Sequence, residues 1–256
     1  MRLDDFQPVP AEVYNRDYFL HHMEGADDFE QTRGGVLSPR LAYALELAHV
    51  QPGQCVLDLG CGRGEVAWRC AQLQAEAHGL DYSRAALEIS AELRAQAQRA
   101  GMVMHLEQAV AYQLPFAAQS FDSVLMLDIV EHLYSPELLS TFVEVHRILK
   151  PGGKLIIHTM PNADYYRWGY PLYRFTLGWL GRNLPRDPRQ RWYRGETHVN
   201  VQSPVSLRQA LRTAGFVSPR VWLQPLNNSP RMRWLIGLYP LRWILCNDIL
   251  AVVAKG

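Results

Sequence analysis

A glycine-rich loop that follows a buried strand is the part of the sequence best suited to hold a ligand. Residues 56–64 read VLDLGCGRG, an apolar run that ends in three closely spaced glycines. Glycine has no Cβ, so the backbone of such a loop can approach a ligand closely and can take positive φ. Asp81 follows 21 residues after Gly60, at the end of the next predicted strand. A carboxylate at about this distance accepts hydrogen bonds from ribose hydroxyls, so the pattern predicts a ligand that contains a nucleoside.

The charge and spacing of this loop narrow the choice of ligand. The glycines are spaced GxGxG, whereas a dinucleotide site reads GxGxxG, and no GK[ST] follows as it would in a P-loop. Asp58 stands two residues before Gly60. A buried carboxylate there would repel a pyrophosphate and help to orient a ligand that carries positive charge. S-adenosylmethionine has an ammonium and a sulfonium group and no phosphate, so both observations predict this cofactor.

The elements that must position the loop alternate between apolar strands and amphipathic helices. This alternation indicates βαβ units and a parallel sheet that is buried on both faces by helices. We therefore expect an α/β fold. The predicted strands are 54–60, 77–83, 102–108, 121–130, 154–160, 220–224 and 248–255, and the predicted helices are 11–24, 38–50, 64–76, 83–100, 136–150 and a helix that begins at Ser203 or Ser206 and ends at Gly215.

Several of these segments resemble one family. VLDLGCGRGE (56–65) closely matches the first motif of the class I S-adenosylmethionine-dependent methyltransferases, and GLDYS (79–83) resembles their ribose-binding strand end. The resemblance covers about 38–162, with weaker matches toward the C-terminus. It implies a Rossmann-like, seven-stranded, mostly parallel sheet in the order 3-2-1-4-5-7-6, with the last strand antiparallel. Further matching segments are LPF and SFDSVLMLDIVEHL within 114–133, LKPGGKLII at 149–157 and HVNVQSPVSLRQALRTAGF at 198–216.

The resemblance also implies roles for individual residues. Asp81 would hold the ribose, with Tyr82 beside it, and Asp58 would orient the cofactor through the loop and water. The positions that would lie near the methionine part of the cofactor and its methyl group are Gly60, Cys61, Gly62, Asp128 and Ile129. The competing interpretations are a plain turn for the glycines and helix caps for Asp81 and Asp128.

One position departs from the family pattern. The family often has Asp-Ala shortly before LPF, with the Asp accepting from the adenine amino group, whereas Val110 and Ala111 stand here. The backbone of Ala111 can still donate to adenine, but the usual side-chain acceptor is missing. Gln108 and Gln113 are the candidate substitutes.

Two histidines are candidate catalytic bases. His132 lies just past the 121–130 strand, and ligands bind at the carboxyl ends of strands in open α/β sheets. Histidine titrates near neutral pH, which suits proton transfer. His198, at the end of a long insertion, is the second candidate. The alternative for His132 is a structural role at the cap of the next helix.

Two segments interrupt the alternation of strands and helices. Residues 163–198 and 226–247 hold five of the seven tryptophans, and the first also holds seven arginines and five tyrosines. Connections this long within an α/β domain are usually functional. We expect one methyltransferase domain over 1–256, with 1–37 as an N-terminal helical cap and the two segments as cap insertions. These insertions fit a packed cap, an acceptor pocket, a peripheral membrane contact or a homodimer interface.

Composition excludes several classes of protein. Of the 256 residues, 48% are hydrophobic and 20% are charged, which excludes a disordered chain. Lys and Arg (26) nearly balance Asp and Glu (25), so no overall field attracts nucleic acid. The four cysteines form no CxxC pair, and we expect reduced thiols, no metal and a cytoplasmic location. The most apolar run, 234–246, is too short to span a membrane.

The sequence therefore predicts transfer of a methyl group from S-adenosylmethionine to a small molecule by in-line displacement. A metabolite, a sugar or glycan precursor and a lipid-linked molecule all fit as acceptor. Two alternatives remain. The Arg-rich segment 163–198 favours a nucleic-acid methyltransferase, which the balanced net charge disfavours, and the missing adenine acceptor favours a non-catalytic cofactor-binding scaffold.

Overall fold

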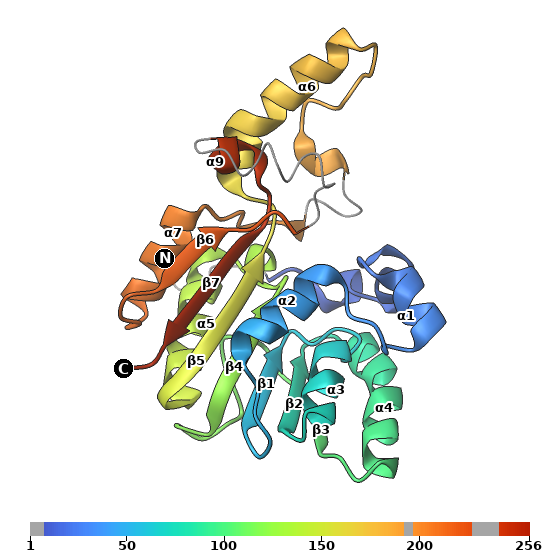
Figure 1. The fold of residues 1–256 in the computed structure, drawn as a ribbon, viewed down its shortest axis with the longest axis vertical. Coiled ribbons are helices and arrows are strands. Elements are labelled where there is room, and N and C mark those ends of the chain that lie inside the picture. The colour runs from blue at the N-terminus through green and yellow to red at the C-terminus, as the bar shows by residue number, and fades with distance from the viewer. Residues whose placement is uncertain (1–7, 192–196, 227–240) are drawn as a thin grey trace.

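A seven-stranded sheet forms the centre of the structure (Figure 1). The computed structural model describes residues 8–191, 197–226 and 241–256. The strand order is β3-β2-β1-β4-β5-β7-β6; β1 to β5 pair in parallel, and β7 is antiparallel to both of its neighbours. The predicted order and the antiparallel last strand are confirmed. The strands are β1 (Cys55–Leu59), β2 (Glu76–Asp81), β3 (Met104–Gln108), β4 (Phe121–Leu127), β5 (Leu149–Thr159), β6 (Arg220–Leu223) and β7 (Ile249–Ala254).

Successive side chains of the central strands point to opposite faces, and helices cover both faces. Val56 of β1 packs into the cluster formed with α2, α3 and α4, whereas its neighbour Leu57 packs into the cluster formed with α5 and α7. The uninterrupted apolar runs of the sequence are therefore buried on both sides. The helices are α2 (Pro39–Ala48), α3 (Glu65–Gln72), α4 (Arg84–Arg99), α5 (Ser135–Ile148) and α7 (Pro204–Thr213).

The N-terminal segment differs from the single helix predicted at 11–24. It forms a 3-10 turn η2 (Ala11–Val13), a π-helical turn η3 (Tyr18–His22) and a short helix α1 (Ala26–Thr32). The Asn15 side chain accepts a hydrogen bond from the backbone amide of Tyr18 at 3.0 Å, which starts a new turn in place of a continuous helix. Gly25, at φ 76°, separates the second turn from α1.

The Pro-Gly-Gly at 151–153, which falls between the predicted helix 136–150 and the predicted strand 154–160, lies inside β5. The pairing with β4 jumps from Phe121↔Leu149 to Ser123↔Lys154, so these residues form an irregularity within the strand. A Cβ on Gly153 would lie 2.9–3.1 Å from three backbone oxygens, which explains the need for glycine where the strands approach closely. The helix before it consequently ends at Ile148 rather than at 150.

The two insertions meet beyond the end of β5. There η5 (Tyr165–Gly169) leads into α6 (Tyr170–Trp179), followed by η6 (Pro188–Arg191), and α9 (Leu241–Leu245) packs against η5. Figure 1 shows α6 projecting away from the sheet. The Asn162 side-chain amide donates to the carbonyls of Trp243 and Cys246, which joins the bases of both insertions. The parts of the insertions at 192–196 and 227–240 lie outside the described residues. Within the described part, no helix combines the length and the hydropathy that a membrane span requires.

Candidate active site

A cavity of about 300 Å³ opens at the carboxyl edge of β1, β2 and β4. The structure brings most of the predicted site residues together in its lining, and Asp58 and Cys61 alone of them are not part of it. The predicted residues that line it are Gly60, Gly62, Asp81, Tyr82, Ala111, Asp128, Ile129, His132 and His198.

The glycine loop adopts the backbone that its sequence predicts. Gly60, Gly62 and Gly64 have φ of 79°, 50° and 81°. The amides of Gly60 and Cys61 both donate to the carbonyl of Leu80, which ties the loop to β2. A Cβ on Gly60 would lie 2.8 Å from Ile129 Cδ1, so a side chain at this position would displace Ile129 and strain a backbone at positive φ.

Asp81 ends β2 beside this loop. Its Oδ2 accepts from the Gly62 amide at 3.0 Å and its Oδ1 from the Ser83 amide at 2.8 Å. Burial raises the pKa of Asp81 to about 6, against the effect of these donors. Each carboxylate oxygen has a second lone pair, so Asp81 can accept further hydrogen bonds from a ligand in the cavity.

Asp58 and Cys61, the two predicted residues outside the lining, support the glycine loop from the side away from the cavity. Asp58 is buried and accepts from the Ala67 amide in the first turn of α3 at 3.2 Å, and burial raises its pKa to about 7. The Cys61 side chain packs against Gly79, where an added Cβ would lie 3.1 Å from the sulfur. Its burial raises the thiol pKa well above the usual value, so Cys61 contributes packing and backbone to the loop.

Asp128 stands in a chain of buried charges that the sequence did not reveal. Arg40 Nε donates to Asp128 Oδ2 at 2.7 Å, and His158 Nδ1 donates to Oδ1 at 2.5 Å. Arg40 also pairs with Glu24, and His158 Nε2 lies 3.3 Å from Asp248. Arg40 and His158 hold the pKa of Asp128 well below its usual range, against its burial, and its carboxylate raises the pKa of His158 to about 10. Arg40 belongs to α2 and His158 to β5, whereas Glu24 precedes α1 and Asp248 precedes β7, which explains why no local motif marks them.

His132 and His198 meet at the same cavity, with ring centroids 5.0 Å apart. His132 Nδ1 lies 3.2 Å from the Thr197 carbonyl, and 2.8 Å from the Tyr14 hydroxyl. Both contacts engage Nδ1, so Nε2 is the ring nitrogen left for a ligand in the cavity. Burial, together with the charge of His198, lowers the pKa of His132 to about 3, so its ring is neutral at physiological pH.

Glu131, beside His132, is a further cavity residue that the sequence analysis did not single out. Thr159 Oγ1 donates to its Oε2 at 2.7 Å. Burial, with the nearby negative charge of Asp128, raises the pKa of Glu131 to about 8, so the carboxyl group is largely protonated at neutral pH. The sequence signal that could have identified Glu131 is its position next to His132, just before the next helix.

The stretch expected to contact adenine, residues 108–113, has no side-chain carboxylate that could accept from the adenine amino group. Val110, Ala111 and Tyr112 line the cavity. Gln108 instead donates to the carbonyl of Tyr82 at 3.2 Å, and neither it nor Gln113 is among the described residues that line the cavity. The stretch therefore offers backbone groups and the Tyr112 ring in place of a side-chain carboxylate.

Arg63 of the glycine loop fixes the N-terminal segment over the cavity. It is fully buried and donates to the carbonyls of Phe19 at 3.2 Å and Glu24 at 2.9 Å, and its charge pairs with Glu65 at 2.8 Å. The guanidinium also lies 4.9 Å from the Phe29 ring centroid. These contacts bring aromatic side chains into the cavity wall. They are Tyr14, Tyr18 and Phe19.

Comparison with known proteins decides the family. The methyltransferase domain family matches residues 57–157. A demethylmenaquinone methyltransferase of Symbiobacterium thermophilum is 30% identical over 223 residues, which cover 82% of this chain and 87% of that protein. The chain belongs to the class I S-adenosylmethionine-dependent methyltransferases. The family resemblance in the sequence is thereby confirmed. Another relative, a demethylmenaquinone methyltransferase of Staphylococcus aureus, is 27% identical over 180 residues, covering 67% of this chain and 71% of that protein.

Solved structures show the same fold for this methyltransferase. A Haloferax volcanii complex of a methyltransferase with its activator gives a TM-score of 0.62 at 18% identity, over 96% of this chain and 99% of that chain. A phosphoethanolamine N-methyltransferase of Haemonchus contortus, solved with S-adenosylhomocysteine, gives 0.64 at 18% identity, over 98% of this chain and 61% of that chain.

The cavity residues fit the cofactor of the family, S-adenosylmethionine. Among the described lining residues, five are carboxylic acids and one is an arginine. Even with Glu131 largely protonated, the acids outnumber the arginine, which suits a ligand carrying an ammonium and a sulfonium group. The glycine backbone at the end of β1 leaves the loop open to a ligand, and Asp81 offers acceptors for ribose hydroxyls. The five acids are Glu24, Asp81, Asp128, Glu131 and Glu137.

Proposed function

We propose that this methyltransferase transfers its methyl group to a small, largely apolar acceptor bound beside His132 and His198. One observation carries the proposal: a single cavity holds the glycine loop, Asp81 and the histidine pair. Aromatic and aliphatic side chains enclose the remainder of that cavity, which suits an apolar molecule. The relatives named for demethylmenaquinone make that compound the first acceptor to assay.

The protein's part in the reaction is alignment. When bound, S-adenosylmethionine supplies an electrophilic methyl group on its sulfonium. Holding the acceptor in line with that methyl group can contribute about 7–11 kcal/mol to catalysis. We assign to His132 Nε2 the hydrogen bond that orients the acceptor, since Nδ1 is engaged with Thr197. A ring with a pKa of about 3 is a weak base, so orientation is its larger contribution.

The first test separates cofactor binding from methyl transfer. We expect calorimetric titration to show S-adenosylmethionine binding that Asp81→Ala weakens by about 1.5–3 kcal/mol, because the variant removes charged acceptors. Asp27→Ala, which changes an exposed carboxylate of α1, is the matched control. Wild-type affinity in Asp81→Ala would place the ribose elsewhere.

The second test concerns the acceptor and His132. With radiolabelled cofactor, we expect label in demethylmenaquinone or another apolar compound, and none in RNA. His132→Ala should lower turnover roughly 10–100-fold while cofactor affinity stays nearly intact, which corresponds to the loss of about 1.5–3 kcal/mol of oriented binding. Label in RNA would overturn the proposed acceptor class, and unchanged turnover would remove His132 from the mechanism.

A further inference from the structure

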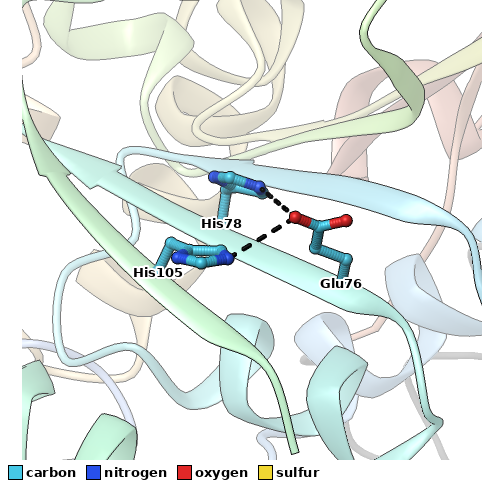
Figure 2. A group of neighbouring side chains, drawn as sticks. All are labelled: Glu76, His78 and His105. Atoms are coloured by element: carbon cyan, nitrogen blue, oxygen red, sulfur yellow. Dashed lines mark ion pairs between the residues drawn. The ribbon is translucent and has the colours of Figure 1, made fainter.

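A second cluster of titratable side chains lies on the sheet, toward the end of β2 that is remote from the cavity. His78 of β2 and His105 of β3 face each other in register, and Glu76 stands two residues before His78 on the same face. Figure 2 shows the three side chains converging, with Glu76 reaching toward both imidazoles. Glu76 begins the strand that Asp81 ends, so the cluster and the cavity lie at opposite ends of β2.

The distances within the cluster match those between ligands of one metal ion. Glu76 Oε1 lies 3.5 Å from His105 Nε2 and 3.7 Å from His78 Nε2. These separations exceed normal hydrogen bonds. Ligands that each bind a tetrahedral Zn²⁺ at about 2.0–2.2 Å stand roughly 3.3–3.6 Å apart. The two Glu76 separations are therefore close to the spacing that an ion would require, and the ligand atoms of all three residues lie within 4.8 Å of one another.

The orientation of His78 adds an independent argument. Its Nδ1 lies 3.0 Å from Oε1 of Glu107, two residues beyond His105 on β3. With Nδ1 directed at this carboxylate, Nε2 is the ring nitrogen that faces Glu76 and His105. Metal-bound histidines commonly donate their second nitrogen to a carboxylate in this way. The His78 and His105 rings are stacked, 4.6 Å apart, which brings both Nε2 atoms to one side.

We propose that Glu76, His78 and His105 bind a divalent transition-metal ion of the Zn²⁺ class. Two imidazoles and one carboxylate favour Zn²⁺ over Mg²⁺ or Ca²⁺, which prefer oxygen ligands. About half of the His105 and Glu76 side-chain surface is exposed, so an ion can enter and water can complete its coordination. The ion would join β3, the edge strand, to β2. No motif in the sequence indicates this site, because its ligands belong to two strands that meet only in the folded sheet.

Calorimetric titration of chelator-treated protein with ZnCl₂ tests this site. We expect one ion per chain, with Glu76→Gln and His105→Ala each weakening binding at least tenfold, and Zn²⁺ raising the melting temperature of the wild type alone. His21→Ala, which removes an exposed histidine outside the cluster, is the matched control. Both test residues are half-exposed, so the fold of each variant can be verified by its melting curve without metal.

Two results would overturn the proposal. The first is Zn²⁺ binding that survives both substitutions. The second is Zn²⁺ binding that is lost in His198→Ala but retained in His105→Ala. Glu131, His132 and His198 also place one ligand atom each within 4.8 Å of one another, and that result would move the ion into the cavity.

A different observation, the exposed helix α6, carries a second inference. Leu172, Phe175 and Trp179 lie at helical spacing and are 48%, 68% and 87% exposed. Trp168, in the turn before them, is 57% exposed and lies under the Arg167 guanidinium at 5.0 Å. Soluble proteins seldom leave an apolar stripe of this kind in water unless another surface covers it.

The charge of the residues around α6 indicates which kind of surface covers its apolar stripe. From 165 to 186 the chain contains four arginines and no acidic residue. Aromatic side chains interspersed with arginines suit the interface of a membrane that contains anionic lipids. The first insertion also begins and ends at the cavity, since Met160 before it and His198 at its end both line that cavity. We infer that α6 docks on an anionic membrane surface and holds the cavity's edge of the sheet toward it.

Co-sedimentation with vesicles tests the inference. We expect the wild type to sediment with vesicles of phosphatidylcholine that contain phosphatidylglycerol, and to sediment less with vesicles of pure phosphatidylcholine. The double variant Phe175→Ser/Trp179→Ser should bind the phosphatidylglycerol vesicles at least tenfold more weakly than the wild type. Val217→Ser changes an equally exposed apolar residue outside α6 and is the control. Equal sedimentation of the double variant would overturn the inference. So would a dimer that the double variant dissociates, or RNA binding that it abolishes.

Discussion

At the scale of single residues, the ion pairs of Asp128 in the wall of the cavity have a large energetic consequence. Asp128 holds a left-handed backbone, with φ 58°, and its carboxylate is shared between Arg40 and His158. Removing one partner from a buried ion pair leaves the other charge uncompensated, which costs about 3–5 kcal/mol. Asp128 therefore positions the loop after β4 through these two cations, and its carboxylate is not free to bind the cofactor's ammonium group alone.

This chain of charges predicts a pH dependence of stability. The pKa of His158 is raised to about 10 in the folded protein, against about 6.5 when unfolded. Its contribution is therefore fully present below pH 6.5 and is lost as the pH rises through 10. We expect the free energy of unfolding of the wild type to exceed that of His158→Gln most at pH 6, and the difference to shrink toward pH 10.

Denaturant melts of both proteins at each pH measure this difference. The comparison is needed because Asp81 and Glu131, whose pKa values are also raised, lower the stability of both proteins as they ionise with rising pH. A difference that stays constant from pH 6 to pH 10 would show that His158 is not charged in the fold. Asp128, whose pKa is lowered, contributes stability above about pH 4 that is lost in stronger acid.

At the scale of elements, the N-terminal segment depends on one arginine for its position over the cavity. Arg63 donates to two carbonyls of that segment and has no exposed surface. We expect Arg63→Lys to keep the charge but lose the fork of donors, weakening cofactor affinity about tenfold and exposing the segment 8–33 to proteases. Titration and limited proteolysis check these outcomes.

A variant on the surface of the same segment is the control for Arg63. Glu30→Gln alters an exposed side chain of α1 and should match the wild type in both measurements. Cofactor affinity that stays at the wild-type value in Arg63→Lys, together with unchanged proteolysis, would mean that the packing of Tyr14 and Phe19 is sufficient to hold the segment.

Elements with a strong local pattern were predictable. Those decided by a local hydrogen bond that competes with the pattern, or by distant contacts, were not. The strands around Val56 and Leu125 have apolar runs, and Ser83, the first residue of the predicted helix 83–100, caps α4. The turns at 11–22 depend on the local hydrogen bond of Asn15, which competes with the helical pattern. The bulge at 151–153 depends on the approach of β4, which no local sequence reveals.

The same distinction applies to the site at the scale of the whole molecule. Gly60, Gly62 and Asp81 form motifs whose spacing along the chain is fixed, and they meet in one cavity. Arg40 and His158 reach Asp128 from 88 and 30 residues away, and His105 joins His78 from a neighbouring strand. Such partners are brought together only by the strand order, so one sequence could predict the family and cofactor but not the charged network.

The placement of the two proposed binding sites yields a final prediction. Glu76 and Asp81 lie at the two ends of β2, about 17 Å apart at the rise of an extended strand. Effects of sites separated by more than about 7–10 Å usually add. A ligand at about 100 times its dissociation constant stabilises the folded state by roughly 2.7 kcal/mol. We therefore expect Zn²⁺ and S-adenosylmethionine to raise the free energy of unfolding independently, with increments that add within about 0.5 kcal/mol when both are present.

Denaturant melts with each ligand and with both measure the sum. A sum that falls well short would show competition, which is the behaviour of an ion bound by Glu131, His132 and His198 inside the cavity rather than by Glu76, His78 and His105.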